Sequence, residues 1–546
     1  MAKVNTKSRT PARSVSSPVK THLGPTTRTY EGGAGYLSAP KGELFRLGVN
    51  YFAGEGTFYE SAESRNARWH TLVEQIAVSD PQWIHGFLTW LRKEGNIRTA
   101  CVTGAAYAVH ARLAANSNDN NMSERGWNRK IVDEVCQRLD EPKEFMAFWT
   151  QTYGRKNIPS CVKRGLSDAI GRLTNEYNYM KYGTQNSDSW KLSDVIEMVH
   201  AQPTGVYQAQ IYKYAVAQGH GNVFDDWKPN MIAANQRLRR DAQRNPRVLL
   251  DAERLKEAGF TWEDALSLAG SNLDKGELWD AIIPNMGIFA LTRNLRNFEQ
   301  AGISAASKGY VRSQLEDPEV IAKSRMFPYN IYAAYKNTPG LTFASSLEEA
   351  IRLSVSNVPE LSGNTLVLSD ISASMGSRMS AKSDMSYAEA AAIFAGAIAL
   401  KNPGRVDFVG YANNTFVQDV PAGGSLLKVV KEFHDKNGRV GGGTETVQSL
   451  RKHYDPSKHN RVVIVTDMQA FQDYHYLWGS YSNSQTVTDV VRSDHWLYGF
   501  SLGGYQASAI PSGSGTRHEI GGLSDATFKI LPLLERGKDA VWPWEQ

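Results

Sequence analysis

The chain has 546 residues, which is too long for one compact core, so we expect at least two domains. Its hydrophobic share of 41% and charged share of 21% are typical of folded globular proteins and argue against wholesale disorder or a long coiled coil. The net charge of +5 is concentrated at the N-terminus, because residues 1–30 carry +6 and the remainder therefore carries −1. Nucleic-acid binding by the folded body would thus require local basic patches.

The basic segment over residues 1–30 allows two interpretations. Its Ser, Thr and Pro content is typical of a disordered, solvated tail. Its positive charge would equally suit salt-sensitive, sequence-independent attraction to phosphates. Both interpretations stay open at this point.

Cysteine usage and hydropathy indicate the compartment. Cys101, Cys136 and Cys161 show neither zinc-site nor disulfide-framework spacing, which favours free thiols in a reducing environment. No apolar run reaches the roughly 18 residues that a membrane span requires, and the N-terminus lacks a secretory pattern. We therefore predict a cytoplasmic protein that does not bind membranes.

Residues 67–355 show helical periodicity almost throughout. In residues 160–176, Val162, Leu166, Ala169, Ile170 and Leu173 recur at three-to-four spacing, which predicts an amphipathic helix. Similar patterns predict about a dozen helices, including one read continuously through residues 276–302. Serial helices indicate a HEAT-like or armadillo-like α-helical array, although the sequence shows no clear internal repeat.

The pattern changes near residue 360 to short apolar runs that alternate with helices. Strands are expected at residues 364–369, 405–411, 461–466 and 495–502, and helices at 386–400 and 527–536. Such alternation predicts a mostly parallel sheet covered on both faces, which is a doubly wound α/β domain. The expected fold is therefore α + α/β.

Polar residues follow the predicted strands where ligands gather in such sheets. Asp370, Ser372 and Ser374 follow the first strand, Asp467 follows the strand 461–466, and Thr444 follows three glycines. Carboxylate and hydroxyl oxygens suit a hard divalent cation, with Mg²⁺ favoured over Mn²⁺ or Ca²⁺. We therefore predict a metal site at these five residues.

The predicted metal site shows no sign of catalysis. A hydrolytic metal needs a general base near its bound water, and the sequence neighbours Met375, Gly376, Met468 and Gln469 supply none. With only two carboxylates, the metal would stay electrophilic toward a water or a carboxylate from another molecule. We therefore predict recognition and no enzymatic activity.

Several motifs in order resemble a known family. DISAS, GGGTET and IVTDMQ resemble the metal-ion-dependent adhesion site of von Willebrand factor A domains. GEGTFYES (54–61), VIEMVHAQP (195–203), LWDAIIPNMGIFALTRNLRNF (278–298) and SRMFPYNIYAAY (324–335) resemble the TROVE module of the Ro ribonucleoprotein autoantigen family and its bacterial relatives. The resemblance covers nearly all of the chain beyond residue 40 and implies a tail (1–30), a TROVE domain (31–355) and an A domain (356–546).

The resemblance implies a ring of HEAT-like repeats closed by the A domain. Such proteins take single-stranded 3′ ends of misfolded or damaged RNAs through the ring and bind small Y RNAs outside it. Bacterial relatives work with a Y RNA and the exoribonuclease polynucleotide phosphorylase. The implied role is a scaffold or gatekeeper in RNA quality control, with a metal-dependent protein-interaction platform as the alternative.

RNA-contact candidates come partly from this resemblance. His200 falls on a family histidine that contributes to Y RNA binding, and Arg164 lies on a helix where the family also carries arginine. The family's further basic residues upstream of Trp190 are missing, because residues 183–189 are uncharged apart from one Asp, so the Y RNA surface would be altered. The full candidate set is Lys163, Arg164, Arg172, Lys181 and His200 for the Y RNA surface, and Arg98, Arg293 and Arg296 for the hole. For Arg98, Arg293 and Arg296, the alternative is an ordinary solvated helix face.

Overall fold

The computed structural model describes residues 15–51, 53–115, 126–156, 158–183, 190–222, 230–324, 326, 328–338, 340–355, 358–381, 383–470, 476–477, 480–481, 485–521 and 525–545. They form two compact units. One contains the chain up to residue 66 together with residues 355 onward, and the other contains residues 67–354. None of the helices in this described part is both long enough and apolar enough to cross a bilayer.

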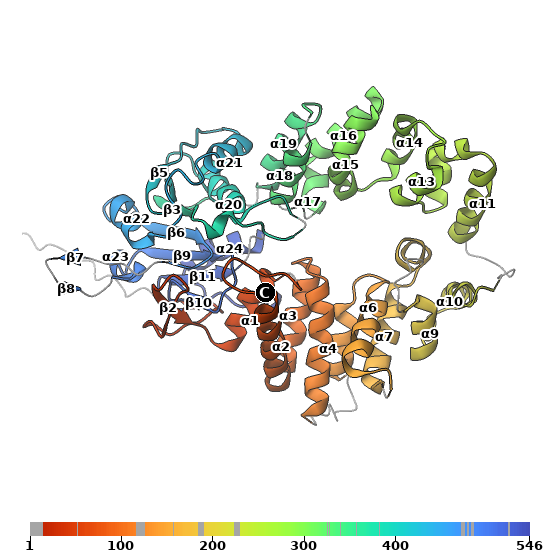
Figure 1. Cartoon of the computed structure of the whole chain (residues 1–546), viewed down its shortest axis with the longest axis horizontal. Helices are drawn as coiled ribbons and strands as arrows, with labels where there is room; N and C mark the ends of the chain where they lie inside the picture. The colour runs from red at the N-terminus through yellow and green to blue at the C-terminus, as the bar shows by residue number, and fades with distance from the viewer. Residues whose placement is uncertain are drawn as a thin grey trace, which may run out of the picture. The chain divides into compact units, whose positions relative to one another are not determined.

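The unit of residues 67–354 is entirely helical where it is described (Figure 1). Its elements are α2 (Ala62–Ser79), α3 (Pro81–Lys93), α4 (Thr99–Ala114), α5 (Trp127–Val135), α6 (Glu141–Tyr153), α7 (Ser160–Leu173), α8 (Glu176–Asn178), η1 (Tyr179–Gly183), α9 (Leu192–Val199), α10 (Val206–Gly219), α11 (Asn230–Arg244), η2 (Pro246–Leu250), α12 (Ala252–Glu257), α13 (Trp262–Ala269), α14 (Lys275–Ile282), η3 (Ile283–Asn285), α15 (Ile288–Ala301), α16 (Ala305–Glu316), α17 (Pro318–Ser324), α18 (Pro328–Asn337) and α19 (Ala344–Ser354).

Contacts in this unit run mainly between helices that are near one another in the chain. Helix α5 packs on α7, α7 on α9 and α9 on α10, and the same pattern continues through α14, α15 and α16 to α19. Local stacking of this kind is the hallmark of repeat architectures. The expected HEAT-like helical array is therefore confirmed as a fold class.

Local sequence explains individual helices. In α7, Val162, Leu166 and Ile170 are fully buried, as their spacing predicts. The helix expected through residues 276–302 is instead broken into α14, η3 and α15, which corrects that prediction. Pro284 cannot continue the hydrogen bonding of α14, and the next helix begins only after Gly287.

The second unit is built around a six-stranded sheet in the order β11-β9-β6-β3-β4-β5, with only β5 antiparallel to its neighbour. Its strands are β3 (Thr365–Asp370), β4 (Val406–Tyr411), β5 (Thr415–Val417), β6 (Arg461–Thr466), β9 (Trp496–Ser501) and β11 (Arg517–Gly521). The remaining elements are β1 (Thr27–Arg28), β2 (Ala34–Leu37), α1 (Pro40–Val49), η4 (Ser374–Gly376), α20 (Tyr387–Lys401), α21 (Leu426–His434), α22 (Thr446–His453), β7 (Tyr476–Leu477), β8 (Ser480–Tyr481), α23 (Val487–Val490), β10 (Ala507–Ser508), α24 (Asp525–Glu535) and η5 (Pro543–Glu545).

Helices cover both faces of this sheet (Figure 1). Phe394 of α20 packs against Phe500 of β9 with ring centroids 4.4 Å apart on one face. On the opposite face Leu450 of α22 joins Leu366 and Ile464 in a buried cluster. The expected doubly wound α/β domain is therefore confirmed.

Because β4 and β6 flank β3 on opposite sides, the chain reverses its direction of winding at the end of β3.

The N-terminal segment belongs to this α/β unit, which corrects two expected boundaries. Val15 and Val19 are 3% and 2% exposed, and β2 pairs with β10, so this segment is anchored on the sheet unit, although residues 22–26 are exposed. Arg46 of α1 is fully buried in an ion pair with Glu519 of β11 at 3.0 Å. The segment therefore contributes to the sheet unit and not to the helical array. The basic residues of 1–14 lie outside the described residues.

Candidate metal centre and basic helix faces

Three loops meet at the carboxyl ends of β3 and β6, the two central strands of the sheet. Asp370 ends β3, and its Oδ2 accepts a hydrogen bond of 2.6 Å from the hydroxyl of Thr466 at the end of β6. The amide of Ala373 donates to the carbonyl of Gly442 at 3.0 Å, which ties the glycine-rich loop to the first loop. The structure thus brings the loops of Asp370, Thr444 and Asp467 together, as the strand order requires.

The first loop is organised by its own side chains. Oδ1 of Asp370 accepts the Ser372 amide at 2.8 Å, and the hydroxyls of Ser372 and Ser374 lie 3.3 Å apart. The Ser374 hydroxyl also lies near the carboxyl group of Asp467 and lowers its pKa. The five predicted ligands, Asp370, Ser372, Ser374, Thr444 and Asp467, are between 0% and 4% exposed. Oxygen atoms are therefore concentrated in a space shielded from bulk water.

The glycines before Thr444 have a structural cause. Gly441 has φ +91°, and a Cβ added there would lie 2.3 Å from Oδ1 of Asn413. That same oxygen accepts the amides of Gly442 at 2.9 Å and Gly443 at 2.8 Å. The loop consequently needs glycine to wrap around Asn413 and to carry Thr444 to the site.

Two neighbouring buried carboxyl groups lie in the candidate site. Burial, more than any other cause, raises the pKa of Asp370 to about 6, and burial together with the charge of Asp370 raises the pKa of Asp467 to about 7. None of the ion pairs in the described part of the chain involves either residue. A hard divalent ion would neutralise both charges, and the donor set of two carboxylates and three hydroxyls fits it.

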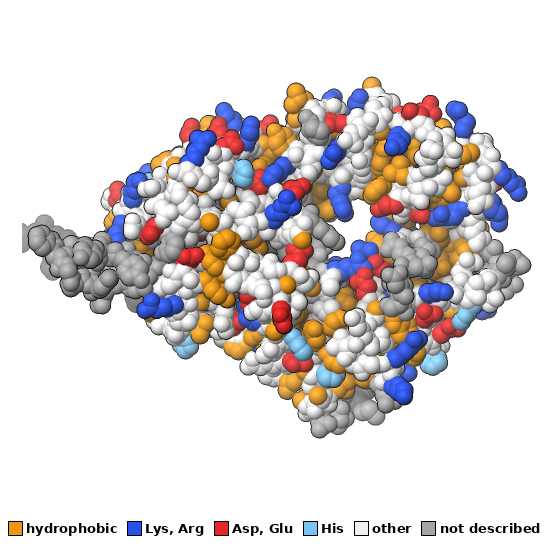
Figure 2. Space-filling model, in the orientation of Figure 1, with side chains coloured by type: hydrophobic (Ala, Val, Ile, Leu, Met, Phe, Trp, Pro, Cys, Tyr) orange, Lys and Arg blue, Asp and Glu red, His pale blue; other side chains and the backbone are white. Residues whose placement is uncertain are grey.

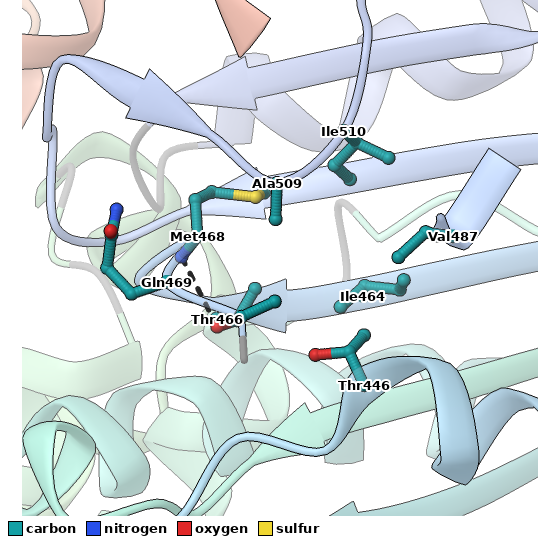
Figure 3. A pocket seen from close by; sticks show the side chains of 9 residues that line it. Thr446, Ile464, Thr466, Met468, Gln469, Val487, Ala509 and Ile510 are labelled. Carbon is teal, nitrogen blue, oxygen red and sulfur yellow. Dashed lines mark hydrogen bonds between the residues drawn. The ribbon is translucent and has the colours of Figure 1, made fainter. Parts of the chain in front are cut away.

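Beside the metal-site loop lies a small pocket lined mostly by apolar side chains (Figure 3). Thr446, Thr466 and Met468 are among its lining residues, which include no ionisable side chain among those described. Met468 follows Asp467 with φ 66°, a conformation that a non-glycine residue adopts rarely. Its amide donates to the Thr466 hydroxyl at 3.3 Å, which stabilises this turn. The pocket supplies no general base to the site.

The sequence analysis missed one element of this site. Tyr59 donates a hydrogen bond to Glu31, and the hydroxyl of Ser374 lies near enough to lower the pKa of Tyr59. Glu31 and Tyr59 lie in segments that we expected to belong to the helical domain. A lone Glu and a lone Tyr that lie far from the D-x-S-x-S loop in sequence carry no local signal of this proximity.

Five of the eight predicted RNA contacts are at least partly exposed in the helical unit and form no ion pair with another described residue. Arg164 of α7 is exposed and Lys163 is partly so, and Arg293 and Arg296 are exposed on one side of α15. His200 is exposed and follows α9 with φ 52°, in the left-handed region. Because α9 packs on α7, His200 belongs to the same neighbourhood of helices as Arg164.

The other three predicted contacts are engaged within the protein. Arg98 bonds the carboxylates of Asp140 at 2.7 Å and of Glu144, and so fastens α4 to α6. Arg172 bonds Asp133 at 3.0 Å and the carbonyl of Cys136 at 2.8 Å. Lys181 lies 5.4 Å from the ring centre of Tyr177 and 5.3 Å from that of Tyr182. These residues have evident structural roles.

Residues 184–189, which carry no basic side chain, lie outside the described residues.

Helix α11 carries a basic face that the sequence analysis did not single out. Arg237, Arg240 and Arg244 are exposed, and their spacing of three and four residues places them within about 60° of the helix circumference. Within the described part of the chain they have no ion-pair partner, whereas nearby Asp241 and Asp264 are bound to Arg254 and Arg239 at 2.6 Å. Figure 2 shows Lys and Arg side chains on the surface over α11. The spacing of these three arginines in the sequence is the signal that would have indicated this face.

Comparisons with known proteins agree with this architecture. Residues 108–341 match the family model of the TROVE domain. Among solved structures, the chain is similar to the Ro (RSR) protein of Deinococcus radiodurans, with 17% sequence identity and a TM-score of 0.58. That similarity covers 91% of this chain and 100% of the Deinococcus chain, and at such low identity it is evidence for a shared fold. The predicted TROVE module and the bacterial Ro-like architecture are confirmed.

Proposed function

We propose, since the chain is a TROVE-domain protein, that it binds RNA through the helical unit and acts as a non-catalytic scaffold in RNA quality control. The observation that carries this proposal is the TROVE match over residues 108–341, which spans the accessible basic residues of α7, α11 and α15. Exposed guanidinium groups without internal partners suit phosphate binding and stacking on bases. The folded body lacks a global positive field, so such local faces are what RNA binding requires.

The RNA ligands proposed are of two kinds, as the resemblance implies. One is a small stem-loop RNA of the Y type, bound near Lys163, Arg164 and His200. The other is the single-stranded 3′ end of a misfolded or damaged RNA, for which Arg293 and Arg296 are the candidate contacts. A 3′-to-5′ exoribonuclease such as polynucleotide phosphorylase is the proposed protein partner, in the cytoplasm.

The metal centre is proposed to recognise a partner and not to catalyse. Asp370, Ser372, Ser374, Thr444 and Asp467 would hold Mg²⁺, with Mn²⁺ or Ca²⁺ as substitutes, and the ion would supply an electrophilic position for a carboxylate. A protein-interaction platform without RNA specificity is the alternative function, and the buried pair of Asp370 and Asp467 is the observation that favours it.

The deciding experiment measures RNA binding by the purified full chain. We expect a stem-loop RNA with a free single-stranded 3′ end to bind, and log K to fall linearly as log salt rises. Asp370→Ala should remove Mg²⁺ binding and leave RNA affinity unchanged, because the candidate RNA contacts lie in the other unit. No RNA binding at low salt would refute the proposal and leave the interaction platform. Equal loss of both activities in Asp370→Ala would refute the division of roles.

A further inference from the structure

Helix α15 has a buried side and an exposed side, and an aromatic residue lies on the exposed one. Leu291, Leu295 and Phe298 are fully buried and follow one another at spacings of four and three residues. At 3.6 residues per turn, Phe289 lies roughly opposite this buried stripe, and it is 42% exposed. Within the described part of the chain its ring stacks on no other aromatic ring and on no cation. The packing of α15 therefore leaves this ring at the surface.

Arg293 and Arg296 lie on the same side of α15 as Phe289. Their positions four and seven residues further along place the three side chains within about 60° of the helix circumference and about 10 Å of its length. Both arginines are exposed, and among the described residues neither forms an ion pair. The acidic residue of this helix, Glu299, is engaged elsewhere, because its Oε2 accepts the amide of Gly340 at 3.0 Å. The face thus combines an aromatic ring with uncompensated positive charge.

Helix α11 carries positive charge without an aromatic side chain. Its exposed Arg237, Arg240 and Arg244 share one face, but residues 230–244 include no Phe, Tyr or Trp. Guanidinium groups alone contact phosphates, which paired and unpaired RNA present alike. An aromatic ring adds a contact only to bases whose faces are open, because bases in a duplex are already stacked on one another. The two faces therefore differ in the RNA structures that they can distinguish.

We propose that Phe289 is a base-stacking residue and that, with Arg293 and Arg296 on the neighbouring phosphates, it makes this face of α15 selective for single-stranded RNA. This inference rests on the proposed RNA binding and adds the group that distinguishes single strands from duplexes. Helix α11 binds the phosphate backbone of either form. Stacking on an aromatic ring strengthens binding by roughly 5- to 150-fold per base and tolerates any base, so the selectivity is for unpaired structure and not for sequence.

Fluorescence anisotropy with the full chain tests this role on three RNAs of equal length: a single strand, a duplex, and a single strand of abasic ribose phosphates. The abasic strand keeps every phosphate but lacks the bases, so its weaker binding measures the contacts made to bases. We expect Phe289→Ala to bind the intact single strand at least about 5-fold more weakly, and to bind the duplex and the abasic strand as the wild type does. Phe289→Tyr keeps an aromatic ring and should retain the wild-type preference.

Tyr310→Ala is the matched control, because Tyr310 on α16 is 38% exposed and has no basic residue three or four positions away on its helix. It should leave all three affinities unchanged. If a folded Phe289→Ala variant, checked by thermal melting, binds the intact single strand as the wild type does, or loses affinity equally for all three RNAs, the stacking role is overturned. Failure of the wild type to bind any of these RNAs at low salt would instead overturn the proposed RNA binding itself.

Discussion

At the scale of single residues, the proposed metal centre would depend on groups that orient the ligands as well as on the ligands. Asp370 accepts hydrogen bonds from the Thr466 hydroxyl on Oδ2 and from the Ser372 amide on Oδ1, so both of its oxygens are fixed before any ion arrives. Groups that orient a metal ligand typically contribute about 10- to 100-fold to metal affinity. Thr466 is the clearest such group here, because it is not itself a predicted ligand.

Thr466→Val should therefore weaken Mg²⁺ binding by roughly 10- to 100-fold, because Asp370 loses a fixed donor while the side-chain shape is nearly kept. Isothermal titration calorimetry with the full chain measures this. Ser369→Ala is the control, since the buried Ser369 hydroxyl next to Asp370 has no hydrogen-bond partner among the described residues. Equal Mg²⁺ affinity in Thr466→Val and the wild type would contradict the orienting role.

At the scale of secondary-structure elements, buried polar groups connect the sheet to its surroundings. Arg461 at the start of β6 is 1% exposed and bonds Glu535 at the end of α24, with Nε to Oε1 at 2.6 Å. Its Nη1 donates to the Thr365 hydroxyl of β3 at 2.8 Å. One guanidinium thus links two strands with the closing helix, and it would be left as an uncompensated buried charge without Glu535.

Glu535→Ala should destabilise the sheet unit by roughly 3 to 5 kcal/mol, because it leaves the buried guanidinium of Arg461 without its carboxylate partner. Chemical denaturation followed by a probe in the sheet unit measures the loss. Asp494→Ala breaks the exposed pair with Arg492 and should leave the midpoint unchanged within error. Similar midpoints for the two variants would contradict this account of Arg461.

Strand β11 carries a buried histidine that makes stability depend on pH. Nε2 of His518 donates to the carbonyl of Gly515 at 3.0 Å, and Nδ1 accepts from the Ser17 hydroxyl at 2.9 Å. Burial lowers the pKa of His518 to about 4, from 6.5. The unfolded chain therefore binds the extra proton more readily than the folded one. The stability that neutral His518 contributes to the folded state is therefore complete above about pH 6.5 and is lost as pH falls toward 4.

His518→Gln should flatten this dependence. Between pH 6.5 and 4 the wild type should lose more stability than the variant, by up to roughly 3 kcal/mol. Other groups that titrate in this range are common to both proteins, so the difference between the two denaturation series isolates His518. Parallel pH profiles would refute the assignment.

At the scale of the whole molecule, the two units divide the proposed work. The helical unit has accessible basic faces on α7, α11 and α15, and the α/β unit has the buried oxygen-lined centre. Residues 1–14, which lie outside the described residues, carry four positive charges and no negative one, so the rest of the chain has a net charge of only +1. RNA affinity should therefore depend on these few faces and on the basic residues 1–30. Helix α11 provides the sharpest test, because its three exposed arginines lie on one face.

Replacing Arg237, Arg240 and Arg244 together by Gln should weaken RNA binding about equally for all sequences. The slope of log K against log salt should fall in magnitude by roughly 2 to 3, because each lost phosphate contact removes about one released counterion. Lys428→Gln with Lys431→Gln on α21 removes exposed charge from the other unit and should change little. An unchanged slope in the α11 variant would show that α11 does not contact RNA.

The sequence by itself determined the fold class and named the five candidate ligands of the proposed metal centre. Helical periodicity and strand alternation are local patterns, and ligands at strand ends follow from sheet topology, so Asp370 and Asp467 could be named in advance. Tertiary structure decided which arginines are free, since Arg98 and Arg172 are bound by carboxylates on other helices. It also decided that residues 15–66 belong to the sheet unit, because contacts between residues hundreds of positions apart leave no periodic trace in the chain.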